Sequence, residues 1–137
     1  MDTGPLAAAF ANAPLPGVVS AYLFGSHAMG GAHRESDIDI GVLLDRRVHP
    51  RPQDRFEVRL RLIAHISRVL RTDRVDLVVL DDAPPHLARR VMLEGQRVFC
   101  ADSEIDHAAR RTAMLRAPDL EPFLRRTRRV KLQAIAR

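Results

Sequence analysis

Runs of apolar residues separated by turn signals predict the strands of a small domain. Val18–Phe24 is a short β-branched, aromatic and aliphatic run that Gly25 stops, which is typical of a buried strand. Two further strands are expected over Asp37–Leu44 and Arg74–Leu80, and a last one over Gln96–Phe99. The chain therefore alternates strand patterns with other elements from its first third onward.

Between these strands, apolar residues recur at the spacing of a helix. In Pro52–Leu70 the apolar residues recur every three or four positions, which predicts a helix packed on one side against the sheet. The residues of this stripe are Phe56, Leu60, Ile63, Ile66 and Leu70. Other helices are expected over 5–13, 83–94 with Gly95 at its end, 103–115 and 120–135.

This order of elements predicts an α+β fold, a small mixed β-sheet with helices packed mainly on one face. A chain of 137 residues is large enough for one sizeable core and too short for a second folded unit. We expect one domain over residues 1–100 and a basic helical extension over 101–137 that packs on it.

The strand Asp37–Leu44 carries an informative alternation. Successive strand side chains point to opposite faces of a sheet, so Asp37 and Asp39 share one face. The opposite face is aliphatic, with Ile38, Ile40, Val42 and Leu44. We expect the aliphatic face to join the core and the acidic face to stay open.

Composition excludes several classes of protein. No stretch approaches the ~20 apolar residues that span a bilayer, and Met1–Pro5 lacks the basic start of a signal peptide. Cys100 is the only cysteine, so neither an intramolecular disulfide nor a multi-cysteine metal cluster can form. A reducing cytoplasm and no membrane partner are expected.

The net charge of +5 is concentrated in the extension, where residues 101–137 hold nine Lys/Arg against five Asp/Glu. A basic segment can bind nucleic acid. Most of these charges are arginines spaced like a solvated helix face, however, and only Phe123 offers a stacking ring. The solvated face is the favoured interpretation, and nucleic-acid binding is the less favoured one.

Three aspartates form the candidate chemical centre. Asp37 and Asp39 stand two residues apart on one strand, and Asp76 lies inside another aliphatic strand, where a carboxylate is costly unless it is paired or metal-bound. Edge exposure would be the structural explanation for Asp76. Two Mg²⁺ ions about 3.5–4 Å apart, held by such carboxylates, can clamp the attacking and leaving oxygens of nucleotidyl transfer.

Gly25 and Ser26 end the first strand and begin a turn. Exposed backbone N–H groups and a hydroxyl at such a turn can hold a triphosphate, and glycine leaves room for its approach. Arg34 is a further candidate for a charge contact to phosphate. Taken alone, a Gly-Ser pair is most often only a turn, and an Asp-x-Asp pair is usually solvated; their combination with Asp76 points to catalysis.

The motif carries a resemblance to a known family. Leu23-Phe24-Gly25-Ser26-His27-Ala28-Met29-Gly30 followed by Ser36-Asp37-Ile38-Asp39-Ile40 resembles the signature of the DNA polymerase β-like nucleotidyltransferases. The resemblance covers roughly residues 18–99, and within that superfamily the chain is most similar to the minimal nucleotidyltransferases, called MNT proteins.

The resemblance implies roles for individual residues. Asp37 and Asp39 are expected to bind Mg²⁺, and Asp76 to be the third carboxylate, which helps to activate the acceptor hydroxyl. ATP is the expected substrate. Gly25 and Ser26 are expected to contact the nucleotide phosphates. Arg34 and Ser36 are two further candidates for nucleotide binding, chosen for their position in the sequence.

The resemblance also implies a partner. Many MNT proteins are antitoxins that neutralise a HEPN-domain ribonuclease toxin by transferring AMP from ATP to one of its tyrosines. His27 and Met29 depart from the arginines that are common in the family, so either nucleotide affinity is weaker or Arg34 compensates for the missing charges. Two alternatives stay open: an acceptor that is a small molecule or an RNA end, and a non-catalytic antitoxin that only binds its partner.

Overall fold

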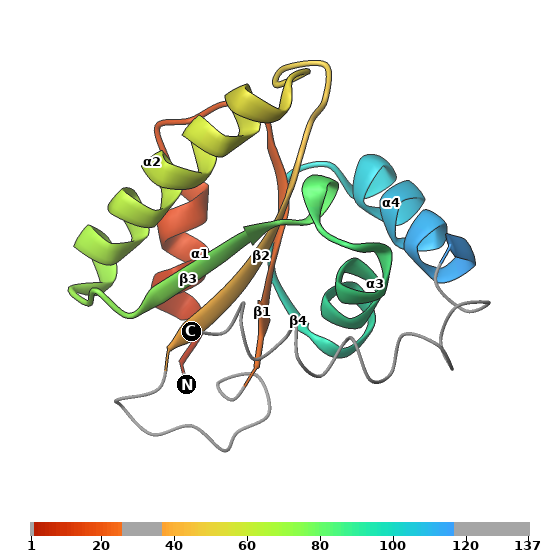
Figure 1. The fold of residues 1–137 in the computed structure, drawn as a ribbon. Coiled ribbons are helices and arrows are strands. Elements are labelled where there is room, and N and C mark those ends of the chain that lie inside the picture. Colours follow the sequence, from red (N-terminus) through yellow and green to blue (C-terminus); the bar gives the residue numbers. More distant parts are fainter. Residues whose placement is uncertain (1, 26–36, 117–137) are drawn as a thin grey trace.

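The computed structural model describes residues 2–25 and 37–116, which form a sheet between two pairs of helices (Figure 1). The elements in chain order are α1 (Gly4–Ala11), β1 (Val18–Phe24), β2 (Ile38–Leu44), α2 (Pro52–Leu70), β3 (Val75–Val79), the 3-10 turn η1 (Leu80–Asp82), α3 (Pro85–Glu94), β4 (Gln96–Cys100) and α4 (Ser103–Arg116). The expected strands and the first four expected helices are confirmed. The helix expected over 120–135 lies outside the described residues.

The four strands form one mixed sheet in the order β3-β2-β1-β4. β1 is antiparallel to both β2 and β4, whereas β2 and β3 are parallel. Parallel neighbours need a crossover connection, and α2 supplies it. The start of β2 and the start of β3 consequently lie at the same end of the sheet.

Helices cover both faces of this sheet. The aliphatic face of β2 packs with α1 and α2 in one core cluster, as expected. A second cluster joins Tyr22 of β1 and Leu43 of β2 to residues of α3 and α4. Figure 1 shows the two pairs of helices on opposite sides of the sheet. The mixed α+β fold is confirmed, but the expectation that the helices pack mainly on one face is wrong.

The acidic face of β2 is likewise less open than expected. A Cβ atom on Gly41 would lie 2.7 Å from Val91 Cγ1, so α3 packs closely over this position. Asp39, two residues earlier on the same face, is only 6% exposed. The second pair of helices therefore covers much of the face that alternation alone left to solvent.

The buried stripe of α2 differs from the expected one. Val58, Leu62 and Ile66 are buried at spacings of four residues, whereas Phe56 is 57% and Leu60 is 49% exposed. Each exposed residue stands two positions from Val58, about 200° around a helix with 3.6 residues per turn. Both side chains therefore point away from the core.

A buried carboxylate that sequence reasoning missed fixes α4 to the sheet. Asp106 is 1% exposed. It accepts hydrogen bonds from Ser20 Oγ at 2.6 Å and Tyr22 Oη at 2.7 Å, and it pairs with Arg97 at 3.0 Å. Burial and the bond to Asp106 raise the pKa of Tyr22. Ser20 and Tyr22, two residues apart on one strand face, were the available signal for this cluster.

No helix in the described part of the chain is both long and apolar enough to cross a membrane.

Replacing Asp106 with alanine is expected to lower the free energy of unfolding by about 2–4 kcal/mol. The change removes the shared acceptor of Ser20 and Tyr22 and leaves two buried hydroxyls unpaired. Glu104→Ala, an exposed position on the same helical turn, should change stability by less than about 0.5 kcal/mol. Urea unfolding of both variants is the measurement, and equal losses would contradict a specific role for Asp106.

Candidate active site

Three strand ends bring the predicted acidic residues together. Because β2 and β3 are parallel, Asp39 lies directly opposite Asp76 in the strand register. On the other side of β2, Asp39 is opposite Phe24, the last residue of β1, which Gly25 follows. The candidate site therefore forms where β1 ends and where β2 and β3 begin.

Asp39 is a buried carboxylate without a hydrogen-bonded partner for one of its oxygens. Among the described residues no group donates a hydrogen bond to Asp39 Oδ1, although this atom is inaccessible to solvent. Burial, together with the neighbouring negative charges of Asp76 and Asp37, raises the pKa of Asp39 to about 7. A positive charge at this position would relieve both the desolvation and the repulsion.

Asp76 has a similar environment with one cation nearby. Its Oδ2 atom is buried and lacks a hydrogen bond from the described residues. Burial raises its pKa, and the Arg59 charge opposes that shift. Arg59 Nε also donates a 2.7 Å hydrogen bond to the carbonyl oxygen of Leu77, the next residue on β3. This arginine, which resembled an ordinary solvated helix residue, had no sequence signal.

Asp37 lies just before β2 and is more accessible than the other two carboxylates. Its side chain is 36% exposed and forms an ion pair with Arg74 at 3.9 Å. The Arg74 carbonyl oxygen accepts a 2.7 Å hydrogen bond from the Ile38 N–H, which holds the start of β3 against the start of β2. Arg74 thus balances part of the negative charge of the cluster.

Position 25 requires a glycine for two reasons, its backbone conformation and the closeness of Asp39. Its φ of +75° lies in the left-handed region that glycine adopts without strain. A Cβ atom at this position would also collide with Asp39 Oδ2. The turn therefore lets the backbone pass directly against the carboxylate of Asp39.

The chemistry of the donor set fits divalent cations. Within residues 2–25 and 37–116, no three Asp, Glu, His or Cys side chains already converge as a complete metal site. Mutual repulsion of uncompensated carboxylates opposes such convergence, and Mg²⁺ commonly takes only one or two carboxylates and completes its shell with water and substrate phosphates. The two orphaned oxygens of Asp39 and Asp76 are hard ligands of the kind that Mg²⁺ prefers.

The structure thus brings together Gly25, Asp37, Asp39 and Asp76, and their roles stay predictions. The other predicted nucleotide contacts, Ser26, Arg34 and Ser36, lie outside the described residues, as do His27 and Met29.

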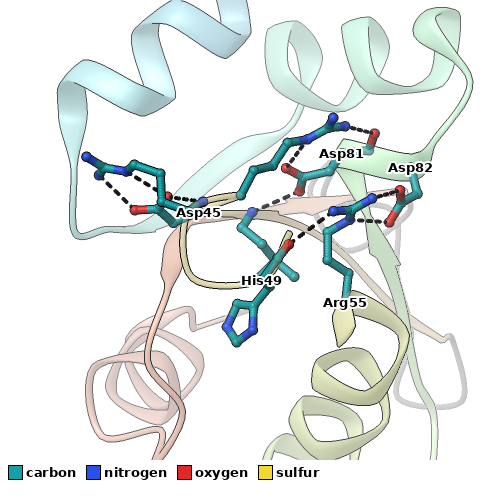
Figure 2. Close-up of polar contacts among 8 residues, drawn as sticks. Asp45, His49, Arg55, Asp81 and Asp82 are labelled. Atoms are coloured by element: carbon teal, nitrogen blue, oxygen red, sulfur yellow. Dashed lines mark hydrogen bonds and ion pairs between the residues drawn. The ribbon is translucent and has the colours of Figure 1, made fainter. Parts of the chain in front are cut away.

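A second charged cluster occupies the opposite end of β2 and β3 (Figure 2). Asp82 accepts two hydrogen bonds from Arg55, at 2.9 Å and 2.8 Å, and Arg55 also donates to the His49 carbonyl oxygen at 3.0 Å. Asp81 accepts a 2.9 Å bond from the Leu44 N–H. Asp81 and Asp82 thus both accept hydrogen bonds, and neither has a buried oxygen without a donor among the described residues, in contrast to Asp39 and Asp76.

Comparison with known proteins adds a family and a fold. The family model described as polymerase beta nucleotidyltransferase matches residues 8–104. Protein adenylyltransferase MntA of Shewanella oneidensis is 35% identical over 85 residues, which cover 62% of this chain. The match spans 56% of the length of that relative, just over half.

Solved structures share the fold of this chain. A toxin–antitoxin structure with AMP-PNP has a TM-score of 0.63 at 23% identity and is covered completely, as is this chain. The toxin–antitoxin MntA-HepT has a TM-score of 0.56 at 21% identity, with coverage of 98% of this chain and 97% of that one. At these identities the likeness establishes the fold.

The raised pKa of Asp39 predicts how stability depends on pH without metal. The unfolded chain releases this proton near pH 3.8, the ordinary pKa of an aspartate, whereas the folded protein keeps it to about pH 7. The folded state therefore binds more protons over this interval, and its stability falls as pH rises from about 4 to 7. Asp39→Asn should remove this contribution and stabilise the protein at pH 8 by about 2–4 kcal/mol.

Asp73→Asn is the matched control, because Asp73 is exposed between α2 and β3. Urea unfolding in EDTA at pH 5 and pH 8 measures the effect. Parallel pH profiles for the wild type and Asp39→Asn would contradict the buried, uncompensated carboxylate.

Proposed function

Because this chain belongs to the polymerase beta nucleotidyltransferase family, we propose that it transfers AMP from magnesium-bound ATP to a tyrosine hydroxyl of a partner HEPN-domain ribonuclease toxin. The chain would thereby act as the antitoxin of that partner. The observation that carries the proposal is the pair of in-register carboxylates, Asp39 and Asp76, whose buried oxygens lack hydrogen-bond donors in the described residues.

The reaction assigns a task to each residue of the site. Asp37, Asp39 and Asp76 would hold two Mg²⁺ ions, which when bound neutralise the triphosphate and the charge that develops on the attacking and leaving oxygens. The parallel strands hold Asp39 and Asp76 side by side before substrate arrives. Asp76, whose pKa burial raises, is suited to accept the acceptor proton. Gly25 leaves the backbone accessible to phosphate.

The relatives support the choice of nucleotide and acceptor. The 35% identical relative is named a protein adenylyltransferase, which points to AMP as the transferred group and to a protein as the acceptor. Structures with the same fold contain the MntA-HepT toxin–antitoxin and a toxin–antitoxin with AMP-PNP. A reaction that consumes ATP also agrees with the expected cytoplasmic location.

A non-catalytic antitoxin is the second candidate, and His27 and Met29 favour it because they replace two arginines of the family pattern. Such a protein would neutralise its partner by occlusion and would have no need of an intact acidic cluster. Retention of all three aspartates, two of them with orphaned buried oxygens, favours the catalytic function.

Incubation with labelled ATP, Mg²⁺ and the partner HEPN-domain ribonuclease should label a tyrosine of that protein. Asp39→Asn should reduce the labelling rate by at least about 10³-fold, because a catalytic ligand is lost while the side chain keeps its shape. Asp73→Asn should label the partner at the wild-type rate.

Neutralisation of the ribonuclease separates the two candidates. The enzymatic function requires Asp39→Asn to leave the toxin active, whereas occlusion requires the variant to neutralise it as the wild type does. An unlabelled partner in the presence of wild-type protein would also overturn the transfer.

A further inference from the structure

A large groove follows the free edge of the sheet, beside the candidate active site. It has a volume of about 900 Å³ and is lined by the first half of α2, by Leu77–Val79 of β3, and by η1 and the start of α3. β3 is the last strand of the sheet on this side, and Figure 1 shows it between α2 and α3. We call this feature the β3-edge groove.

The β3-edge groove has a largely apolar lining, in which Leu77, Val79 and Leu87 are buried and Phe56 is accessible. Phe56, on its α2 wall, is 57% exposed, although an aromatic ring of this size usually lies inside a protein. Leu87 and Pro84 form part of the opposite wall. A hollow of this kind beside an edge strand is a recurrent feature of surfaces that bind a protein segment.

The groove begins on β3 next to the acidic site and extends along this strand towards η1. Asp76 immediately precedes Leu77, the first lining residue of that strand, and Val78 shares a sheet face with Asp76. Two residues along a strand span about 7 Å, a distance that a tyrosine side chain can bridge. A polypeptide lying against Val78 could therefore present a tyrosine hydroxyl to Asp76.

The charges of the groove also favour one class of occupant. Arg59 lines the groove and, in the described part of the chain, has no carboxylate within ion-pair distance. Its neighbour Arg55, one turn earlier, is instead paired with Asp82 at 2.8 Å. The groove therefore combines apolar contact with one cation that suits an acidic side chain of a partner.

We propose that the β3-edge groove binds the polypeptide segment that carries the acceptor tyrosine, with an acidic residue of that segment near Arg59. The proposal rests on the proposed protein-directed transfer of AMP. It assigns Phe56 to recognition of the acceptor and gives it no part in binding the nucleotide.

Phe56→Glu tests the groove, because a charge there opposes an apolar partner. Val69→Glu is the matched control on the same helix, since Val69 is 44% exposed and does not line the groove. Thermal melts and ATP binding in Mg²⁺ should match the wild type in both variants. Affinity for the HEPN-domain protein, measured without nucleotide, should fall about tenfold or more in Phe56→Glu and by less than about twofold in Val69→Glu.

Wild-type affinity of Phe56→Glu for this partner would overturn the proposal. The affinity is measured without nucleotide, so it reports binding of the partner even if the wild type transfers no AMP. Absence of AMP transfer would overturn only the proposed function.

A photo-crosslinking phenylalanine derivative at position 56 identifies the occupant. The expected product joins position 56 to a partner peptide that contains, or directly adjoins, the labelled tyrosine. Crosslinks to a second copy of this chain, or to a partner peptide far from that tyrosine, would overturn the proposal.

Discussion

The parallel pairing of β2 and β3 places two carboxylates against each other in a partly buried position, and much of the molecule follows from this constraint. Asp39 and Asp76 occupy the same register position, and one oxygen of each is buried without a donor from the described residues. Burial of an uncompensated charge costs free energy. The α2 crossover makes the parallel pair, and the left-handed Gly25 lets the end of β1 pass directly against Asp39.

Other buried or partly buried aspartates of the molecule have a structural role and are satisfied by hydrogen bonds. Asp106 is more deeply buried than Asp39, yet two hydroxyls and Arg97 satisfy it. Asp82, at the far end of the sheet, accepts hydrogen bonds from two guanidinium nitrogens of the buried Arg55, Nε and Nη2. Against these satisfied acids, the Asp39–Asp76 pair differs because one buried oxygen of each carboxylate has no hydrogen-bond donor among the described residues, which is the property expected of a site completed by cations and substrate.

Sequence periodicity predicted the strands, the aliphatic face of β2 and the candidate acids, because these depend on local alternation. It could not predict that Asp39 and Asp76 lie in register, since pairing depends on the crossover. The expected stripe on α2 is right at Ile63, Ile66 and Leu70, which pack on the core, and wrong at the exposed Phe56 and Leu60. Periodicity could not exclude Phe56, because it too has helical spacing from other apolar residues; only packing shows that it faces the groove. Asp106 was missed because its two hydroxyl partners, Ser20 and Tyr22, are more than 80 residues away.

The central claim is that Asp39 holds its proton to unusually high pH until a cation compensates its charge. Carbon-13 NMR of the aspartate carboxyl groups, assigned with Asp39→Asn and titrated with and without Mg²⁺ and a non-hydrolysable ATP analogue, measures this directly. The account predicts a carboxyl that titrates near pH 7 in the free protein, and whose pKa falls by more than about one unit when the ligands are present. An Asp39 carboxyl that titrates near pH 3.8, the ordinary pKa of an aspartate, in both samples would contradict the buried, uncompensated carboxylate.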